Sequence, residues 1–161
     1  MALLNIIKEG DETLRRISRP VENITPRIIT LLDDMRETLA DADGVGLAAP
    51  QVGVLRQVVL VVDTSDNDRI YELINPEIID REGEQEDIEG CLSIPGTWAI
   101  THRPLRVVVR ATDRDGNEFT VTGEGLTARA FCHEIDHLSG KLFTDNALHI
   151  LTPEEVQKIM G

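Results

Sequence analysis

The residues with the clearest capacity for chemistry lie in a short motif, His133-Glu-Ile-Asp-His137. In a helix, positions i and i+4 lie about 40° apart around the axis, so both imidazoles face one side and can share a metal ion. Glu134 lies beside them, where a carboxylate can take a proton from a water molecule that the metal activates. This spacing, in a chain with 4 histidines, indicates a metal-dependent hydrolase rather than an ordinary charged helix.

A catalytic metal of this kind needs a third protein ligand and an open position. The sequence continues toward the metzincin pattern, but Phe143 stands where that pattern requires its third histidine. Other downstream candidates lie at unsuitable distances from the motif: His149, Glu154 and Glu155. Upstream, Cys91 is the better candidate, because a thiolate binds Zn²⁺ or Fe²⁺ strongly and Gly90 lets the backbone come close.

The second cysteine, Cys132, directly precedes His133 and therefore projects about 100° away from the ligand face of the helix. We interpret Cys132 as a buried structural thiol. Two more specific readings of these residues remain open at this point. One is a zinc endopeptidase, which Phe143 disfavours, and the other is a structural module whose four ligands would be Cys91, Cys132, His133 and His137.

The elements that must position these residues follow from hydrophobic spacing and turn signals. We predict helices over 26–42, 124–139 and 153–160, with Gly140 ending the second, strands over 57–62, 70–74 and 77–80, and a hairpin that joins 106–112 to 118–122. The expected fold is α+β, with short antiparallel β-sheets packed around the central helix that carries the motif. There are no repeats or linkers, so residues 1–161 are expected to form a single catalytic domain.

Composition narrows the function classes. The net charge of −13 and an aromatic content of 3% argue against a nucleic-acid binder, which needs a basic footprint or stacking side chains. The first apolar run is too short for a signal peptide or a membrane span, and two cysteines are too few for a disulfide framework. We therefore expect a cytoplasmic protein with no membrane partner.

A second motif, Gly44-Val-Gly-Leu-Ala-Ala-Pro-Gln51, formally matches a dinucleotide fingerprint with Asp63 about twenty residues further on. The context contradicts that reading, because a helix precedes the glycines and Pro50 blocks the helix that should follow them. A backbone that lines a substrate groove, with Gln51 reaching inward, fits better.

Three motifs in this order, Gly44–Gln51, Glu89–Ser93 and His133–His137, resemble the signature motifs of the peptide deformylase family. The similarity extends to Ile6–Arg16, Ile74–Pro76, Arg106–Asn117 and Lys141–Phe143, and so covers almost the whole chain. The resemblance implies an enzyme that removes the formyl group from the N-terminal formyl-methionine of new polypeptides and releases formate.

The same resemblance implies roles for individual residues. Cys91, His133 and His137 would hold one divalent metal, usually Fe²⁺, with Zn²⁺, Ni²⁺ or Co²⁺ as substitutes. Glu134 would be the general base, and the Leu92 backbone N–H and the Gln51 amide would stabilise the oxyanion. Val45 and Gly46 would bind the backbone of the substrate. Ile94, Leu126 and Ala130 would line the pocket for its methionine side chain.

Five further expectations concern the surroundings of the site and the partners. Glu89, paired with Arg103, is expected to orient a ligating imidazole; Asp136 is either a similar support or a solvated acid. Trp98 either caps the mouth of the pocket or packs in the core. The chain is expected to be a monomer. Ribosome binding is expected to be weak, because the C-terminal segment has Lys158 as its only basic residue.

Overall fold

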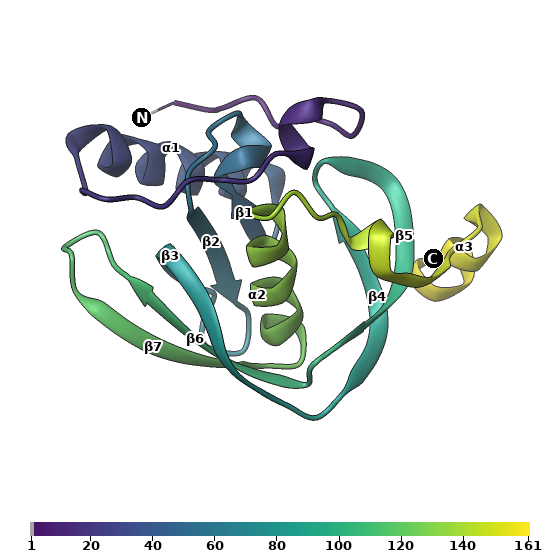
Figure 1. The fold of residues 1–161 in the computed structure, drawn as a ribbon. Helices are drawn as coiled ribbons and strands as arrows, with labels where there is room; N and C mark the ends of the chain where they lie inside the picture. The colour runs from purple at the N-terminus through teal and green to yellow at the C-terminus, as the bar shows by residue number, and fades with distance from the viewer. Residues whose placement is uncertain (1) are drawn as a thin grey trace.

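The computed structural model describes residues 2–161 (Figure 1). Three α-helices, eight strands and three short 3₁₀ helices follow one another along this part of the chain. Their order is η1 (Glu12–Arg15), α1 (Pro26–Ala42), β1 (Gly46–Ala48), η2 (Ala49–Val52), β2 (Val58–Asp63), β3 (Arg69–Glu82), β4 (Gln85–Cys91), β5 (Ile94–Arg103), β6 (Arg106–Thr112), β7 (Glu118–Glu124), α2 (Leu126–His137), η3 (Phe143–Asn146), β8 (Ala147–Ile150) and α3 (Pro153–Met160).

The strands form two antiparallel sheets. The larger has the order β1-β2-β3-β6-β7 and the smaller has the order β4-β5-β8. The predicted α+β class with antiparallel sheets is therefore confirmed, as is the hairpin of β6 and β7, in which Val109 faces Val121.

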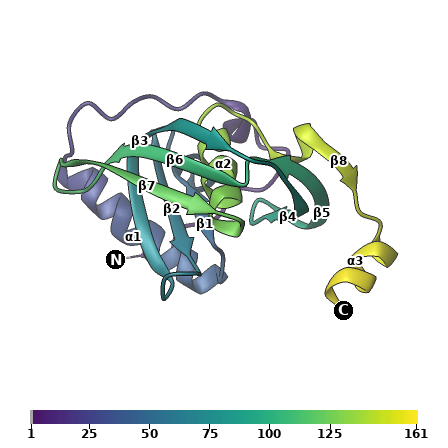
Figure 2. The ribbon, with the colours of Figure 1, turned by 90° about the horizontal axis from the view of Figure 1, so that it is seen from below.

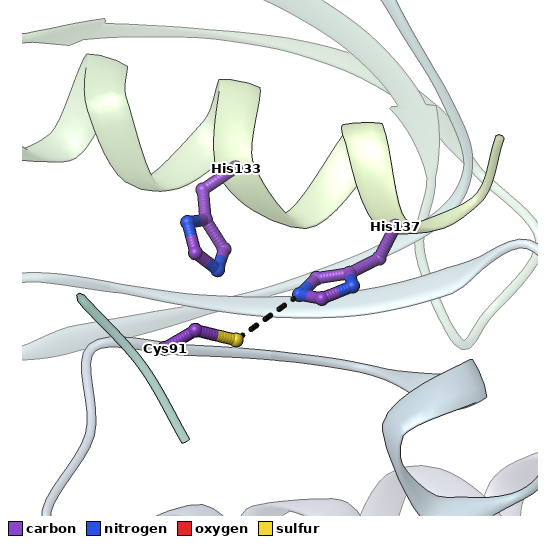
Figure 3. Close-up of side chains that lie close together, drawn as sticks. All are labelled: Cys91, His133 and His137. Carbon is purple, nitrogen blue, oxygen red and sulfur yellow. Dashed lines mark hydrogen bonds between the residues drawn. The ribbon is translucent and has the colours of Figure 1, made fainter. Parts of the chain in front are cut away.

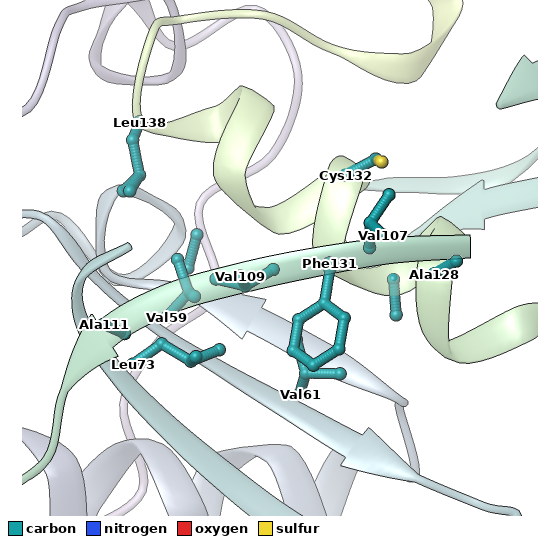
Figure 4. Close-up of a cluster of buried hydrophobic side chains, with 12 residues drawn as sticks. Val59, Val61, Leu73, Val107, Val109, Ala111, Ala128, Phe131, Cys132 and Leu138 are labelled. Carbon is teal, nitrogen blue, oxygen red and sulfur yellow. The ribbon is translucent and has the colours of Figure 1, made fainter. Parts of the chain in front are cut away.

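The larger sheet lies between two helices because β2 is apolar on both faces, as its sequence predicts. Val59 and Val61 join the cluster formed with α2, whereas Val58 and Leu60 join the cluster formed with α1. Figure 4 shows the first cluster, with the ring of Phe131 from α2 against the strands. Helix α2 also contacts β5 of the smaller sheet, so it lies between the two sheets (Figure 1).

Helix α1 begins and ends as predicted. Pro26 stands in its first turn, where a missing N–H costs nothing, and Thr25 is the N-cap residue, although its side chain makes no capping hydrogen bond. Leu32, Met35 and Leu39 are buried at helical spacing against the larger sheet.

Helix α2 is shorter than predicted, because its regular part spans Leu126–His137 instead of 124–139. The predicted role of Gly140 nevertheless holds. Gly140 has φ +72°, its N–H donates to the His137 carbonyl, and the next N–H, of Lys141, donates to the Asp136 carbonyl. These two bonds are the Schellman pattern, in which glycine takes the left-handed position after a helix.

The predicted strand segments 70–74 and 77–80 are confirmed as strand, but they are two parts of one strand, β3. The first part pairs with β2 and the second with β6, and Pro76, which has no N–H to donate, lies at the register shift between them. Strands β4, β5 and β8 were not predicted at all. Strand β4 carries Glu86, Asp87 and Glu89, and such a polar run lacks the apolar alternation from which strands are read.

The C-terminal helix α3 has the predicted bounds and lies beyond β8, at the outer end of the smaller sheet (Figure 2). Thr152 caps it, since its side chain accepts a hydrogen bond from the Glu155 N–H. Within residues 2–161, no helix combines the length and the apolar character needed to cross a bilayer.

Candidate metal centre and its cavity

Two elements from different parts of the chain bring the three predicted ligands together. Cys91 ends β4, whereas His133 and His137 lie one turn apart on α2 (Figure 3). Their ligand atoms all lie within 4.8 Å of one another, and Cys91 Sγ is 3.5 Å from His137 Nε2. Ligands that bind one tetrahedral ion at about 2.0–2.3 Å lie about 3.5 Å apart, so a thiolate and two imidazoles in this arrangement fit a divalent transition metal.

A hydrogen-bonded network fixes His133 from behind. Glu89 Oε2 is 2.6 Å from His133 Nδ1, which leaves Nε2 as the nitrogen on the ligand side. The same carboxylate accepts hydrogen bonds from Arg103 and from Thr101, at 2.8 and 2.7 Å. Burial alone would raise the pKa of Glu89, but its hydrogen bonds with His133 and Arg103 lower this pKa to about 2. Glu89 is therefore an anion at physiological pH and orients the imidazole.

Asp136 takes part in this network. Arg103 donates to Asp136 at 2.7 Å while it also binds Glu89, so one guanidinium links β5, β4 and α2. Of the two readings of Asp136, the structure therefore favours the supporting one.

The environment gives the two histidines different pKa values. Burial, followed by the positive charge of His133, lowers the pKa of His137 to about 3. Burial would also lower the pKa of His133, but the negative charge of Glu134 and hydrogen bonds to Cys91 and Glu89 outweigh it and raise that pKa. His137 is consequently neutral at physiological pH, which is the form that binds a metal.

Glu134 is 4% exposed and differs from Glu89 in its partners. Among residues 2–161, its Oε1 atom has no hydrogen-bond partner, and burial raises its pKa to about 7. The edge strand β1 passes directly against this carboxylate, since a Cβ atom on Gly46 would collide with it. Gly46 thus makes room for a buried carboxyl group that can gain or lose a proton near neutral pH.

Gln51 reaches the same place from η2. Its Oε1 accepts a hydrogen bond from the Ala48 N–H at 2.9 Å, which leaves the amide Nε2 directed at Ser93 Oγ and Cys91 Sγ, at 3.0 and 3.6 Å. The inward position predicted for Gln51 is therefore observed. Leu92 follows Cys91 at the turn between β4 and β5.

A cavity of about 410 Å³ opens beside these groups. All the predicted substrate-binding residues line it, together with the predicted oxyanion pair and the base: Val45, Gly46, Gln51, Leu92, Ile94, Leu126, Ala130 and Glu134. Trp98 lines it as well. Sequence reasoning missed Ile88 and Arg129. Arg129 lies three residues after Leu126 and four before His133, so helical spacing alone could have placed it on this face.

The other candidate ligands lie elsewhere. Cys132 is buried in the cluster between α2 and the larger sheet, where burial raises the pKa of its thiol to about 11. Phe143 stacks on the His133 ring, with centroids 5.8 Å apart. His149 instead pairs with Glu155 at 2.9 Å. The group of ligand atoms therefore does not include a fourth protein ligand from Cys132, as the closed structural module would require.

Comparison with known proteins gives a consistent result. The family model described as polypeptide deformylase matches residues 3–151. The peptide deformylase of Acetivibrio thermocellus is 56% identical over 158 residues, which cover 98% of this chain and 91% of that protein. Among solved structures, the peptide deformylase of Legionella pneumophila is 43% identical with a TM-score of 0.86, over 97% of this chain and 90% of that one. The Thermus thermophilus enzyme is 40% identical with a TM-score of 0.84, over 98% and 91% of the two chains.

Proposed function

The chain belongs to the polypeptide deformylase family, whose members are metal-dependent hydrolases that remove the N-terminal formyl group of nascent polypeptides, and from this premise we propose how its own residues carry out the reaction. The observation that carries the proposal is the convergence of three ligand atoms within 4.8 Å of one another beside the buried carboxyl group of Glu134, whose Oε1 atom has no hydrogen-bond partner among residues 2–161.

Cys91, His133 and His137 would hold the metal, and we propose Fe²⁺ as the native ion, with Zn²⁺, Ni²⁺ or Co²⁺ able to replace it. A soft thiolate with two imidazoles suits all four ions. When bound, such an ion supplies Lewis acidity toward the formyl carbonyl and lowers the pKa of a water molecule.

Glu134 moves the proton. Burial raises its pKa to about 7 in the metal-free protein, so this carboxyl group can exchange a proton near neutral pH, as the group that takes a proton from the attacking water and gives it to the leaving amine must. Oε1 of Glu134 is free to take this proton, because it has no hydrogen-bond partner within the described part of the chain. The products are formate and a free methionyl N-terminus.

Gln51 and Leu92 stabilise the developing negative charge on the formyl oxygen. The Gln51 amide is held by Ala48 and directed toward Cys91, and Leu92 contributes its backbone N–H. Donors fixed in advance are worth more than donors that must reorient during the reaction.

The substrate binds as an added strand. Strand β1 is the edge of the larger sheet, and Val45 and Gly46 line the cavity there, so a peptide backbone can pair with it. The methionine side chain then enters the apolar part of the cavity lined by Ile94, Leu126 and Ala130.

The remaining elements of the proposal follow from this function. We place the chain in the cytoplasm, where nascent chains are made, and propose a monomer with one catalytic domain over 1–161, since one chain supplies every proposed site residue. Ribosome association is proposed to be weak, because α3 has eight residues and Lys158 is its only basic one.

The test is anaerobic turnover of formyl-Met-Ala and acetyl-Met-Ala by protein loaded with Fe²⁺ or Ni²⁺, followed by detection of the free amine. We expect chelator-sensitive cleavage of the formyl peptide alone. Absence of cleavage by protein shown to contain one metal ion per chain would overturn the proposal.

A further inference from the structure

Trp98 is the one tryptophan of the chain, and nothing in the proposed reaction uses it. It lies on β5, is partly exposed, and belongs to none of the hydrophobic clusters found among residues 2–161. Its carbonyl accepts a hydrogen bond from the Leu151 N–H at 2.9 Å, which fixes its backbone. A large aromatic side chain held in this way outside the core is available to a ligand.

The indole ring lies against the backbone beside the metal ligand. A Cβ atom on Gly90 would be 2.5 and 2.6 Å from Cζ3 and Cε3 of Trp98, so only the bare Cα of a glycine leaves room for the ring. Gly90 precedes Cys91 and lies at an irregularity in the pairing of β4 with β5. The ring therefore covers the segment that delivers Cys91.

Trp98 also forms part of the wall of the 410 Å³ cavity in which the proposed reaction takes place. The wall continues along β5 through Pro95, Gly96 and Thr97 to Trp98, whereas Ile94 and Ala130 are buried deeper in it. Pro95 and Gly96 are exposed and Trp98 is half-buried, so this part of β5 lies nearer the opening of the cavity than Ile94 does.

An extended peptide sends alternate side chains to the same side, about 6.6 Å apart. If the first side chain occupies the inner part of the cavity, the third returns to the same wall further out. Resting on the proposed function, we propose that Trp98 is a specificity-determining residue that binds an apolar or aromatic side chain at the third position of the formylated peptide.

The first experiment measures discrimination. The peptides are formyl-Met-Ala-Xaa-amides with Phe, Leu, Ser or Asp as Xaa, and formyl-Met-Xaa-Ala-amides serve as the positional control. We expect the protein to prefer Phe over Ser at the third position by about 3- to 10-fold in kcat/KM, the range of an aromatic contact. The ratio should fall to about one in Trp98→Ala and be largely retained in Trp98→Phe.

A matched control is Leu148→Ala, which removes an exposed apolar side chain from β8 of the same sheet but outside the cavity. Its ratio should equal that of the unchanged protein. Equal cleavage of all third-position peptides, or a preference that depends on the second position instead, would overturn the proposal. Because the readout is a ratio, a general loss of activity in a variant does not affect it.

The second experiment does not depend on turnover. Since Trp98 is the sole tryptophan, its fluorescence reports directly on its surroundings. Titration with the product peptide Met-Ala-Phe-amide should change the emission more than titration with Met-Ala-Ser-amide. An unchanged emission with a peptide that inhibits the enzyme would place Trp98 away from the bound chain. Loss of all deformylation would contradict the proposed function, whereas this titration would still test Trp98.

Discussion

Two buried glutamates flank His133, and their comparison separates support from chemistry. Glu89 is 7% exposed and Glu134 is 4% exposed, so burial penalises both charges similarly. Glu89 is bound by Arg103, Thr101 and His133, and its pKa is about 2. Oε1 of Glu134 has no hydrogen-bond partner among residues 2–161, and the pKa of this group is about 7. Hydrogen-bond partners, rather than depth, decide which carboxylate stays charged and which can exchange a proton.

The largest expected effect comes from removing the exchanging carboxylate. Glu134→Ala should lower turnover of formyl-Met-Ala by about 10²- to 10⁴-fold, the usual contribution of general acid–base catalysis. Metal content per chain should be unchanged, because Cys91, His133 and His137 remain. Parallel activity and metal assays check this, and unchanged turnover would sink the assignment of Glu134 as the base.

A smaller loss should follow from crowding Glu134 without removing it. Gly46→Ala places a methyl group against the Glu134 carboxylate, so the carboxylate must move. We expect turnover to fall by about 10- to 100-fold, the effect of a displacement near 1 Å at a reacting group. Gly116→Ala is the control for a glycine-to-alanine change outside the site, because Gly116 lies at an exposed turn with open space around it. Its φ of +84° strains an alanine, but this strain is far from the cavity. Its activity should stay near that of the unchanged protein.

Replacing Glu89, the glutamate that supports His133, should lower the affinity for the metal instead. Glu89→Gln removes the charge that orients His133, and we expect metal affinity to fall by about 10- to 100-fold. Competition with a chelator measures this. Glu86→Gln, an exposed glutamate on the same strand, is the matched control and should bind metal as the unchanged protein does. Equal affinity in Glu89→Gln would remove the distinction between the two glutamates.

The two glutamates should also give metal-free protein opposite pH dependences. The pKa of Glu89 is depressed in the folded state, so its stabilisation is present above about pH 4.5 and is lost as the pH falls toward 2. The shift corresponds to about 3 kcal/mol in the free energy of unfolding. The pKa of Glu134 is raised, so its contribution is present below about pH 4.5 and is lost as the pH rises through about 7. Urea unfolding of the metal-free protein at several pH values measures both dependences. Glu89→Gln should remove the loss of stability below about pH 4.5, and Glu134→Gln should remove the loss as the pH rises through about 7.

The smallest effect is expected at the cysteine that lies outside the site. Cys132→Ala should retain metal and turnover and lose about 1 kcal/mol of stability, because the thiol packs in the core. Loss of metal in this variant would restore the closed four-ligand alternative.

The sequence predicts best those site residues whose relative positions depend on a single element. His133, Glu134 and His137 follow from local helical spacing, because their relative positions depend on one helix. Cys91 is 46 positions from His137, and spacing alone left it as one candidate among several until three motifs were considered together. The network around Glu89 could be anticipated only in part, since it requires β4, whose polar sequence does not read as a strand, and β5, which was not predicted either. Arg129 was missed although its helical spacing was visible.

The division of the ligands between β4 and α2 has a mechanical consequence. An ion bound there adds a further link between the smaller sheet and the helix, which already meet through the pairs of Asp136 with Arg103, His133 with Glu89 and Arg129 with Asp87. Because such an ion binds the folded chain and not the unfolded one, a free concentration one hundred times its dissociation constant adds about 2.7 kcal/mol to stability. Loss of the ion would therefore lower the stability of the fold as well as abolish the proposed activity, and a larger unfolded fraction would be open to proteolysis.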